Sequence, residues 1–292
     1  FYVAATIRVF TMKRPDVIVC FTTPPFIALV GWLVRLFRRS KYVYWVMDVY
    51  PDIAVACGVM KERSLLTRFF DGLNRFCLRK ADAVVVLGRC MQSRILDKGI
   101  DPRRVTHIGV WSDQDEVKPI ERMANPYRAE WALGDRFVVM YSGNFGLGHD
   151  VRTMLDAAKR LESNDRIRFV FVGGGKRKAE VEDFVTAEGL ANVVLAPYQP
   201  REKLDQSLSC ADAHLATMIS GAEGAIVPCK LFGIMAAGRP AVFIGHPDSE
   251  LARVIAEHDC GRVIRPGDVE GLIRCVIELA EQRERTEAMG AN

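Results

Sequence analysis

The stretch "RFVVMYSGNFGLGHDVRTMLDAAKRL" (136–161) predicts a strand, a glycine-rich loop and a helix in direct succession. The same succession recurs through the rest of the chain, with further strands expected at 167–173, 191–198, 212–218 and 239–245. Helices are expected in the segments between these strands and in residues 269–285 at the end. Such alternation is the signature of parallel α/β layers.

The N-terminal part of the chain alternates in the same way. Strands are expected at 15–22, 41–48, 82–88 and 104–110, and helices at 25–39, 65–81 and 90–100. Residues 15–22 are a short β-branched run behind a proline, which predicts a buried strand. Residues 1–13 predict the end of a helix, so the usual opening strand, loop and helix are absent. We expect this domain to be incomplete as given.

A polar segment with two prolines, residues 112–134, interrupts the alternation and predicts an interdomain connection. The sequence therefore predicts an α/β protein with two tandem Rossmann-like domains, each built on a parallel sheet. We expect a partial N-terminal acceptor-side domain at 1–112, a linker at 113–134 and a C-terminal binding domain at 135–292.

The composition restricts the kind of protein. A chain of 292 residues can bury two cores, and a net charge of +4 permits an anionic ligand or membrane surface without demanding nucleic acid. Eight cysteines without a CxxC pair and five scattered histidines predict buried free thiols in a reducing compartment and no metal site. The most apolar segment, 26–41, is interrupted by Arg35 and is too short to span a bilayer.

Open parallel sheets bind ligands beyond the carboxyl ends of their strands, which directs attention to three loops of the second domain. In the first loop, 141–150, Gly143, Gly146 and Gly148 let the backbone approach a ligand, and the following helix directs free N–H groups outward. The same pattern is equally typical of a tight turn. It matches neither the dinucleotide nor the P-loop fingerprint.

The second loop, 172–180, joins three glycines to three cations that could bind phosphate. We expect Arg177 and Lys178 to form a solvated first turn of the next helix. For Lys176 both alternatives, a phosphate ligand and a solvated side chain, stay open.

The third loop opens "EGAIVPCKLFGIMAAGRPAVF" (223–243). Pro228 predicts a helix start, because the first turn needs no N–H there. Lys230 in that turn opposes the helix dipole, which is unfavourable unless an anion binds nearby, and such inconsistencies are expected at sites. Glu223 is either a surface acid or an acceptor for sugar hydroxyls.

In the first domain, Asp48 ends a predicted strand and faces the ligand edge. Asp52 just after it is either a second carboxylate at that edge or a helix cap. A group of basic and apolar residues follows an amphipathic pattern: Arg35, Arg38, Arg39 and Lys41 with Trp32, Leu33 and Phe37. This group is typical either of a patch for an anionic membrane leaflet or of a core helix with a charged end.

Together, these motifs resemble the GT-B glycosyltransferases of family 4, in the branch that builds colanic acid and O-antigen. The resemblance rests on "SGNFG", "FVGGG" and "VPCKLFGIMAAGRP" in the second domain, and on "TTPP", "DVYPD" and "ADAVVVLG" in the first. It covers nearly the whole chain, but the family's first glycine loop and its last crossing helix are missing, so we leave open whether this piece alone is active.

The resemblance implies a nucleotide-sugar donor, most often a UDP-sugar, in the second domain. Gly143, Asn144 and Gly146 would lie by the diphosphate, with Gly174 and Lys176 from the second loop; Tyr198 and Gln199 would frame the base, and Pro228 and Gly233 would line the donor helix. The family carries a glutamate where this chain has Gly233, and Glu223 lies two residues further upstream than usual. Lys230 would then compensate by binding the diphosphate. Asp48 matches the position where the family has a His or Asp near the donor sugar.

The resemblance also implies a retaining hexosyl transfer, with Asp48, Lys230 and Glu223 as catalytic residues and without cofactor or metal. The acceptor would be a glycan or polyprenyl-linked sugar, the location cytoplasmic or peripheral at the inner face of the cell membrane, and nucleic acid no partner. Two alternatives remain: a UDP-N-acetylglucosamine 2-epimerase, and a non-catalytic relative or partner subunit that binds nucleotide sugar.

Overall fold

The computed structural model describes residues 1–111 and 117–291, and these divide into two compact units. One unit comprises Phe1–Val110 together with Gly221–Val227, and the other Trp111–Ser220 together with Pro228–Asn292. The start of the expected linker, 113–116, falls outside the described residues. Among the residues described, no helix combines the length and apolar character that crossing a membrane requires.

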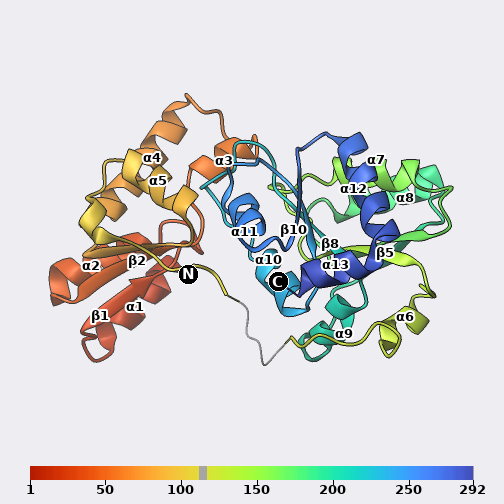
Figure 1. Cartoon of the computed structure of the whole chain (residues 1–292). Helices are drawn as coiled ribbons and strands as arrows, with labels where there is room; N and C mark the ends of the chain where they lie inside the picture. The colour runs from red at the N-terminus through yellow and green to blue at the C-terminus, as the bar shows by residue number, and fades with distance from the viewer. Residues whose placement is uncertain (112–116, 292) are drawn as a thin grey trace. The chain divides into compact units, whose positions relative to one another are not determined.

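The first unit is built on a four-stranded sheet in which every neighbouring pair is parallel, in the order β1-β2-β3-β4 (Figure 1). Its elements are α1 (Tyr2–Thr11), β1 (Val17–Cys20), α2 (Ala28–Arg38), β2 (Lys41–Val46), α3 (Asp52–Ala56), α4 (Leu65–Lys80), β3 (Ala83–Val86), α5 (Arg89–Asp97), the 3₁₀ turn η1 (Pro102–Arg104) and β4 (Val105–His107).

The second unit contains a six-stranded parallel sheet in the order β10-β9-β8-β5-β6-β7. The elements are α6 (Pro126–Glu130), β5 (Phe137–Ser142), α7 (Arg152–Arg160), β6 (Ile167–Val172), α8 (Lys178–Glu188), β7 (Val193–Ala196), η2 (Arg201–Lys203), α9 (Leu204–Ser209), β8 (Ala213–Thr217), α10 (Lys230–Ala236), β9 (Ala241–Ile244), α11 (Glu250–His258), β10 (Gly261–Ile264), α12 (Val269–Glu281) and α13 (Arg283–Gly290). In chain order this is the doubly wound 3-2-1-4-5-6 arrangement, and the prediction of tandem Rossmann-like folds is confirmed.

The central strands of the second unit are buried on both faces, because helices cover each side of the sheet. Phe137, Val139 and Tyr141 of β5 point into a core with α7, α8 and α12, while Val138 and Met140 point to the opposite side, toward α6. Figure 1 shows α7, α8 and α12 gathered on one side of this unit and α6 and α9 on the other. The period of two in side-chain direction therefore supplies two cores from one strand.

Two predicted elements differ in the structure. Residues 15–22 do not form a buried strand: Val17 is 50% and Val19 47% exposed, because β1 is the outer strand of the described sheet and pairs with β2. The single helix expected at 269–285 is instead two helices. They meet at Gln282, whose backbone leaves helical geometry with φ −109° and ψ 53°.

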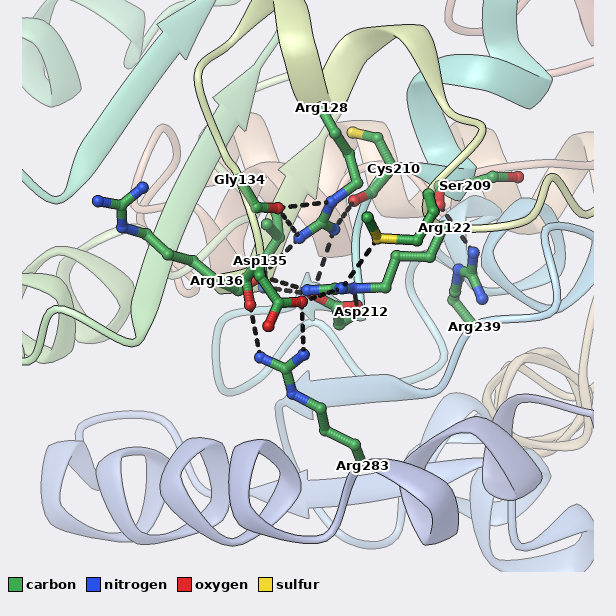
Figure 2. A network of polar contacts seen from close by, with 12 residues as sticks. Arg122, Arg128, Gly134, Asp135, Arg136, Ser209, Cys210, Asp212, Arg239 and Arg283 are labelled. Atoms are coloured by element: carbon green, nitrogen blue, oxygen red, sulfur yellow. Dashed lines mark hydrogen bonds and ion pairs between the residues drawn. The ribbon is translucent and has the colours of Figure 1, made fainter.

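Ion pairs and hydrogen bonds connect several segments at the amino edge of the second sheet, where its strands begin (Figure 2). The Asp212 carboxylate, just before β8, accepts from Arg122 Nε at 2.8 Å, from the Val138 amide at 2.7 Å and from Arg128 at 3.4 Å. Asp135 binds Arg122 and, at 3.2 Å, Arg283 of α13. The described part of the segment after residue 117 is thereby joined to the second unit.

Candidate functional site

The strand order of the second unit locates its ligand site. Strands β6 and β7 are added to one side of β5 and strands β8, β9 and β10 to the other, so the strand order reverses between β5 and β8, which pair in parallel at the centre of the sheet. In doubly wound sheets ligands bind beyond the carboxyl ends of the strands at this reversal. The loops after β5 and β8 are therefore the first candidates.

The loop after β5 is held in one conformation by its own contacts. Gly143 has φ +133° and donates to the Val172 carbonyl at 2.9 Å, and the buried Tyr141 hydroxyl donates to the Asn144 carbonyl at 2.7 Å. Gly146 accepts from the His149 amide at 3.2 Å in a tight turn. The Asn144 residue itself is exposed, so its side chain can reach a ligand.

In the first turn of α7, one of the N–H groups expected to be free, that of Thr153, is already bonded. The Asp150 carboxylate accepts from the Thr153 amide at 3.1 Å and also from the Thr153 hydroxyl. An acid already placed at this positive helix end weakens its attraction for a phosphate. We therefore expect the attraction for a phosphate to come mainly from backbone groups of the second loop and from Lys230 of the third.

The second loop packs against the first, backbone to backbone. A Cβ on Gly173, which has φ +130°, would lie 2.0 Å from the Gly143 carbonyl oxygen, and the Phe145 amide donates to the Gly174 carbonyl at 2.7 Å. Gly175 has φ +123° and is equally enclosed, since a Cβ there would lie 2.2 Å from Asn144 Oδ1. These glycines serve the close approach of the two loops.

The three cations of this loop have different fates. Lys176 is exposed, which leaves its predicted role in donor binding untested. The expected solvated turn is wrong for the other two: Arg177 donates to the His149 carbonyl at 2.6 Å and pairs with Glu180, while Lys178 lies 5.5 Å from the centre of the Phe145 ring. Both side chains lie inward because they brace the first loop.

Lys230 is the cation that the structure places on the ligand edge. The helix α10 begins at Lys230, two residues later than the start expected at Pro228. The Lys230 Nζ lies 3.6 Å from the centre of the Tyr141 ring, donates to the Tyr141 hydroxyl, and is 3.4 Å from the Asn144 carbonyl. A Cβ on Gly143 would lie 2.7 Å from Lys230 Cε.

The ammonium of Lys230 makes no ion pair within the described residues. Burial lowers the pKa of Lys230 to about 7, since desolvation disfavours the charged form. The pKa of the neighbouring His149 is lowered to about 4, first by burial and second by Lys230. A cation without a counterion, held between a tyrosine ring and a glycine loop, is suited to receive an anionic ligand.

A cavity of about 280 Å³ continues from this cation. It is lined by Ser142, Gly143, Val172, Tyr198, Gln199, Leu204, Leu208, His214, Leu215, Lys230, Gly233 and Ile234. The Tyr198 side chain is 57% exposed and lies over Gly174. The Gln199 side-chain amide accepts from the Tyr127 hydroxyl and donates to the Pro197 carbonyl. The lining is mainly apolar, with one cation at its edge, as a nucleotide pocket requires.

In the first unit, Asp48 and Glu223 lie in one region because Gly221–Val227 belongs to that unit. Asp48 bridges Ile226, and the Val49 amide donates to the Ala225 carbonyl at 2.8 Å. Burial raises the pKa of the Asp48 carboxyl.

The Glu223 carboxylate is only partly satisfied. Its Oε2 accepts from the Gly221 amide at 2.8 Å, while its Oε1 is buried without a partner among the described residues. The Glu223 carbonyl accepts from Arg94 at 2.6 and 3.1 Å. Because one of its carboxylate oxygens is buried, Glu223 does not fit the first of the two alternatives, a surface acid.

The alternative that Asp52 caps a helix is wrong. It is the first residue of α3 and pairs with Arg94 at 3.1 Å and with the buried Lys98 at 2.8 Å. Arg94, which joins Asp52 to the segment that carries Glu223, could not be found from the sequence. Their separations along the chain, 42 and 129 residues, explain why.

The amphipathic group on α2 serves the core in part. Arg35 pairs with Asp82 at 2.9 Å, Arg38 donates to the Val9 and Met12 carbonyls, and Trp32 packs edge-on against Phe76. These contacts favour the core helix with a charged end. Phe37, however, is 68% exposed.

A parallel α/β unit and a doubly wound α/β unit in one chain define the GT-B fold class of glycosyltransferases. The family model "Glycosyl transferases group 1" matches residues 124–292, and "Glycosyl transferase 4-like domain" matches residues 2–111. The chain belongs to the group 1 family of glycosyl transferases, which confirms the resemblance seen in the sequence.

Named relatives agree with this family. The chain is 30% identical over 271 residues to the probable glycosyltransferase WbjE of Pseudomonas aeruginosa, covering 92% of this chain and 67% of the relative. It is 27% identical over 269 residues to WcaI of Escherichia coli K12, a putative colanic acid biosynthesis glycosyl transferase, covering 89% and 65%. The chain therefore spans about two thirds of the length of these relatives.

Among solved structures, the fold is similar to Anabaena HepE in complex with UDP and glucose, with a TM-score of 0.79 and 16% identity, covering 100% of this chain and 74% of HepE. It is also similar to a sucrose-phosphate synthase from Thermosynechococcus elongatus, with a TM-score of 0.78, 16% identity, and 99% and 70% coverage. These structures support the fold.

Proposed function

We propose that the protein is a retaining glycosyltransferase that moves a sugar from a UDP-sugar to a glycan or polyprenyl-linked acceptor in surface polysaccharide biosynthesis. The observation that carries this proposal is the unpaired Lys230 ammonium beside the glycine loop at the strand reversal. The name of WcaI supports the polysaccharide pathway, and the complexes of HepE with UDP and with UDP-glucose support the donor.

In this proposal Lys230 binds the diphosphate and stabilises the charge that develops on the leaving phosphate. Gly143 and Asn144 bring backbone groups near the same phosphates, and the fixed loop lets them act without reorganisation. The bond from the anomeric carbon to the phosphate oxygen breaks, the bond to the acceptor oxygen forms, and the acceptor proton goes to the departing diphosphate. No side chain needs to act as nucleophile.

The first unit supplies the acceptor side of the proposed reaction. In this proposal Asp48 and Glu223, which lie in the same unit, accept hydrogen bonds from sugar hydroxyls; the carboxylate oxygen of Glu223 that has no partner among the described residues supports this role. The exposed Phe37 on α2 supports docking at the inner membrane surface. We infer a cytoplasmic site of action at that surface.

A thermal-shift titration with UDP, GDP and ADP tests the donor assignment. A ligand at about 100 times its Kd adds roughly 2.7 kcal/mol, or about 5–10 °C in the midpoint of a unit of this size. The shift should occur with UDP, vanish in Lys230→Ala and persist in Lys203→Ala, a matched exposed lysine. In turnover, Lys230→Ala should cost about 2–4 kcal/mol of transition-state stabilisation. A Lys230→Ala enzyme with near-normal turnover would contradict the role of this residue.

A non-catalytic relative that binds nucleotide sugar without transfer is the second candidate. Gly233 favours it, because no carboxylate stands at this position of the cavity wall. Incubation with labelled UDP-sugar and a lipid-linked acceptor separates the two: sugar in the lipid fraction supports the transferase, and binding without transfer supports the relative. An altered UDP-sugar in the absence of acceptor would instead reveal the epimerase.

A further inference from the structure

Tyr141 carries a hydroxyl that its packing does not require. The side chain belongs to β5, is 0% exposed, and lies against the rings of Phe145 and His149, with 4.6 and 6.1 Å between ring centres. A phenylalanine would fill the same space without burying a polar group, whereas a buried hydroxyl costs free energy unless it forms hydrogen bonds. The role of this hydroxyl must therefore be sought in its partners.

The hydroxyl has two partners of different kinds. It donates to the Asn144 carbonyl of the first loop at 2.7 Å, and it accepts from the Lys230 ammonium. Burial raises the pKa of Tyr141, so the hydroxyl keeps its proton at neutral pH. Because that proton is directed to Asn144, the lone pairs of the oxygen remain for the ammonium, whose Nζ lies 3.6 Å from the ring centre.

No carboxylate pairs with Lys230 among the described residues, so neutral groups hold it. The Asn144 carbonyl lies 3.4 Å from Nζ, and the His149 imidazole, whose pKa is lowered to about 4, is uncharged at neutral pH. Burial lowers the pKa of Lys230, and Cys229, the residue before it, raises it to a smaller extent. The Tyr141 hydroxyl is thus the side-chain acceptor on which the ammonium rests.

We propose that Tyr141 is a positioning residue of the transfer reaction, whose hydroxyl holds the Lys230 ammonium against the first glycine loop. The inference rests on the proposed function, in which Lys230 stabilises the leaving diphosphate. Fixed donors stabilise developing charge without reorganisation, but a lysine side chain is flexible and needs contacts to fix it. Tyr141 provides one, because β5 lies at the centre of the sheet between β6 and β8.

Calorimetric titration with UDP at pH 7 tests this in Tyr141→Phe, which keeps the ring and removes the hydroxyl. Loss of an acceptor disfavours the ammonium, so the pKa of free Lys230 should fall from about 7 by about one unit. Proton uptake on binding should then rise from about 0.5 to about 0.9, and the Kd should weaken about fivefold. The phosphate of the nucleotide contributes equally in both proteins.

The sign of the change in uptake separates this role from a purely structural one. If Tyr141→Phe merely loosened the loop, water would reach Lys230, its pKa would rise, and proton uptake would fall, which would overturn the inference. Tyr42→Phe is the matched control, because the Tyr42 hydroxyl is also buried, in the other unit, and has no partner among the described residues. It should change neither the uptake nor the Kd.

The effect of the hydroxyl on UDP should pass through the lysine. In a Lys230→Met background, Tyr141→Phe should weaken UDP binding by less than about twofold, so the two substitutions are not additive. Equal effects in both backgrounds would overturn the inference, because the hydroxyl would then act only through the Asn144 carbonyl.

The pair can also be tested without a nucleotide, and without Tyr141→Phe should that variant not fold. In free wild-type protein with ¹³C-labelled tyrosine, the Cζ signal of Tyr141 should shift with a midpoint near pH 7 as Lys230 titrates, and Lys230→Met should abolish the shift. A wild-type signal that does not titrate would overturn the inference and leave the proposed donor intact. Titration in a protein that binds no UDP would overturn the proposed function, and the role in transfer with it.

Discussion

Binding of UDP should draw a proton onto Lys230. Burial holds the pKa of Lys230 at about 7 in the free protein, well below its ordinary value of 10.5. A diphosphate beside the ammonium favours the charged form and raises that pKa again. At pH 8, about nine in ten free molecules carry a neutral Lys230, so binding should take up to about 0.9 proton.

The affinity should fall as the pH rises. Above pH 7 each unit lowers the charged fraction of free Lys230 about tenfold, which weakens the Kd for UDP by up to tenfold until the pKa of the complex is reached. Calorimetry at pH 8 in two buffers with different ionisation enthalpies counts the protons, and a series from pH 7.5 to 9 gives the slope. The series begins above the phosphate's own pKa of about 6. Uptake below about 0.2 proton, with a flat Kd, would refute the desolvated lysine.

The same lysine predicts a pH-dependent stability. Between pH 7 and 10.5 the unfolded chain holds the Lys230 proton more tightly than the folded chain does, so the free energy of unfolding rises with pH across this window. Lys230→Met lacks this contribution. Its advantage over the wild type in urea unfolding should therefore shrink by about 2–3 kcal/mol from pH 7 to pH 9. Equal differences at both values would speak against burial of the charge.

Three further substitutions follow from the contacts. Asp212→Ala removes the carboxylate that pairs with Arg122 and Arg128 (Figure 2), and should lower the free energy of unfolding in urea by about 3–5 kcal/mol. Gly173→Ala drives a methyl into the Gly143 carbonyl, so both the thermal midpoint and UDP affinity should fall. Arg94→Met releases the segment that carries Glu223, and should reduce turnover at least tenfold while the UDP thermal shift persists.

Each of these has a matched control. Asp101→Ala removes an exposed ion pair and the cap of η1, and should lower stability much less than Asp212→Ala does. Gly189→Ala has a positive φ but open space around it, so it isolates backbone strain from the clash at Gly173. Arg75→Met breaks the pair with Asp71 and a hydrogen bond to the Lys98 carbonyl, but among the described residues no bond to the segment that carries Glu223. Controls that behave like their partners would contradict the specific contacts named.

The alternation of strands and helices could be predicted because each is a local pattern. Apart from β10 (Gly261–Ile264), for which no strand was predicted, the strands of both sheets lie within the short apolar runs that predicted them. The exposure of β1 could not be predicted, because the pattern of apolar residues in a strand does not say which other strands lie beside it. The prediction that Arg177 and Lys178 form a solvated turn was wrong for the same reason. Charge predicts solvent, but the His149 carbonyl and the Phe145 ring that draw these side chains inward come from another loop.

At the site, Lys230 could be found from the sequence because it conflicts with its own helix. Its setting could not, since Tyr141 is 89 residues away and looks like any strand residue. Arg94 gave no local conflict and went unseen. Local inconsistency is thus a usable signal for a ligand, whereas a residue that only braces a loop across the fold leaves no mark in its neighbourhood.

The tight contact between the two glycine loops has a consequence for how this protein can diverge. A methyl group at position 173 or 175 would meet the backbone of the first loop, and position 143 has a φ of +133° that other residues rarely adopt, so we expect all three glycines to be retained whatever sugar is used. Gly233 is under no such constraint, and the exposed Tyr198 has space to change. New donor preferences are therefore expected to arise by substitution at these two permissive positions, while the loops that hold the phosphate persist unchanged.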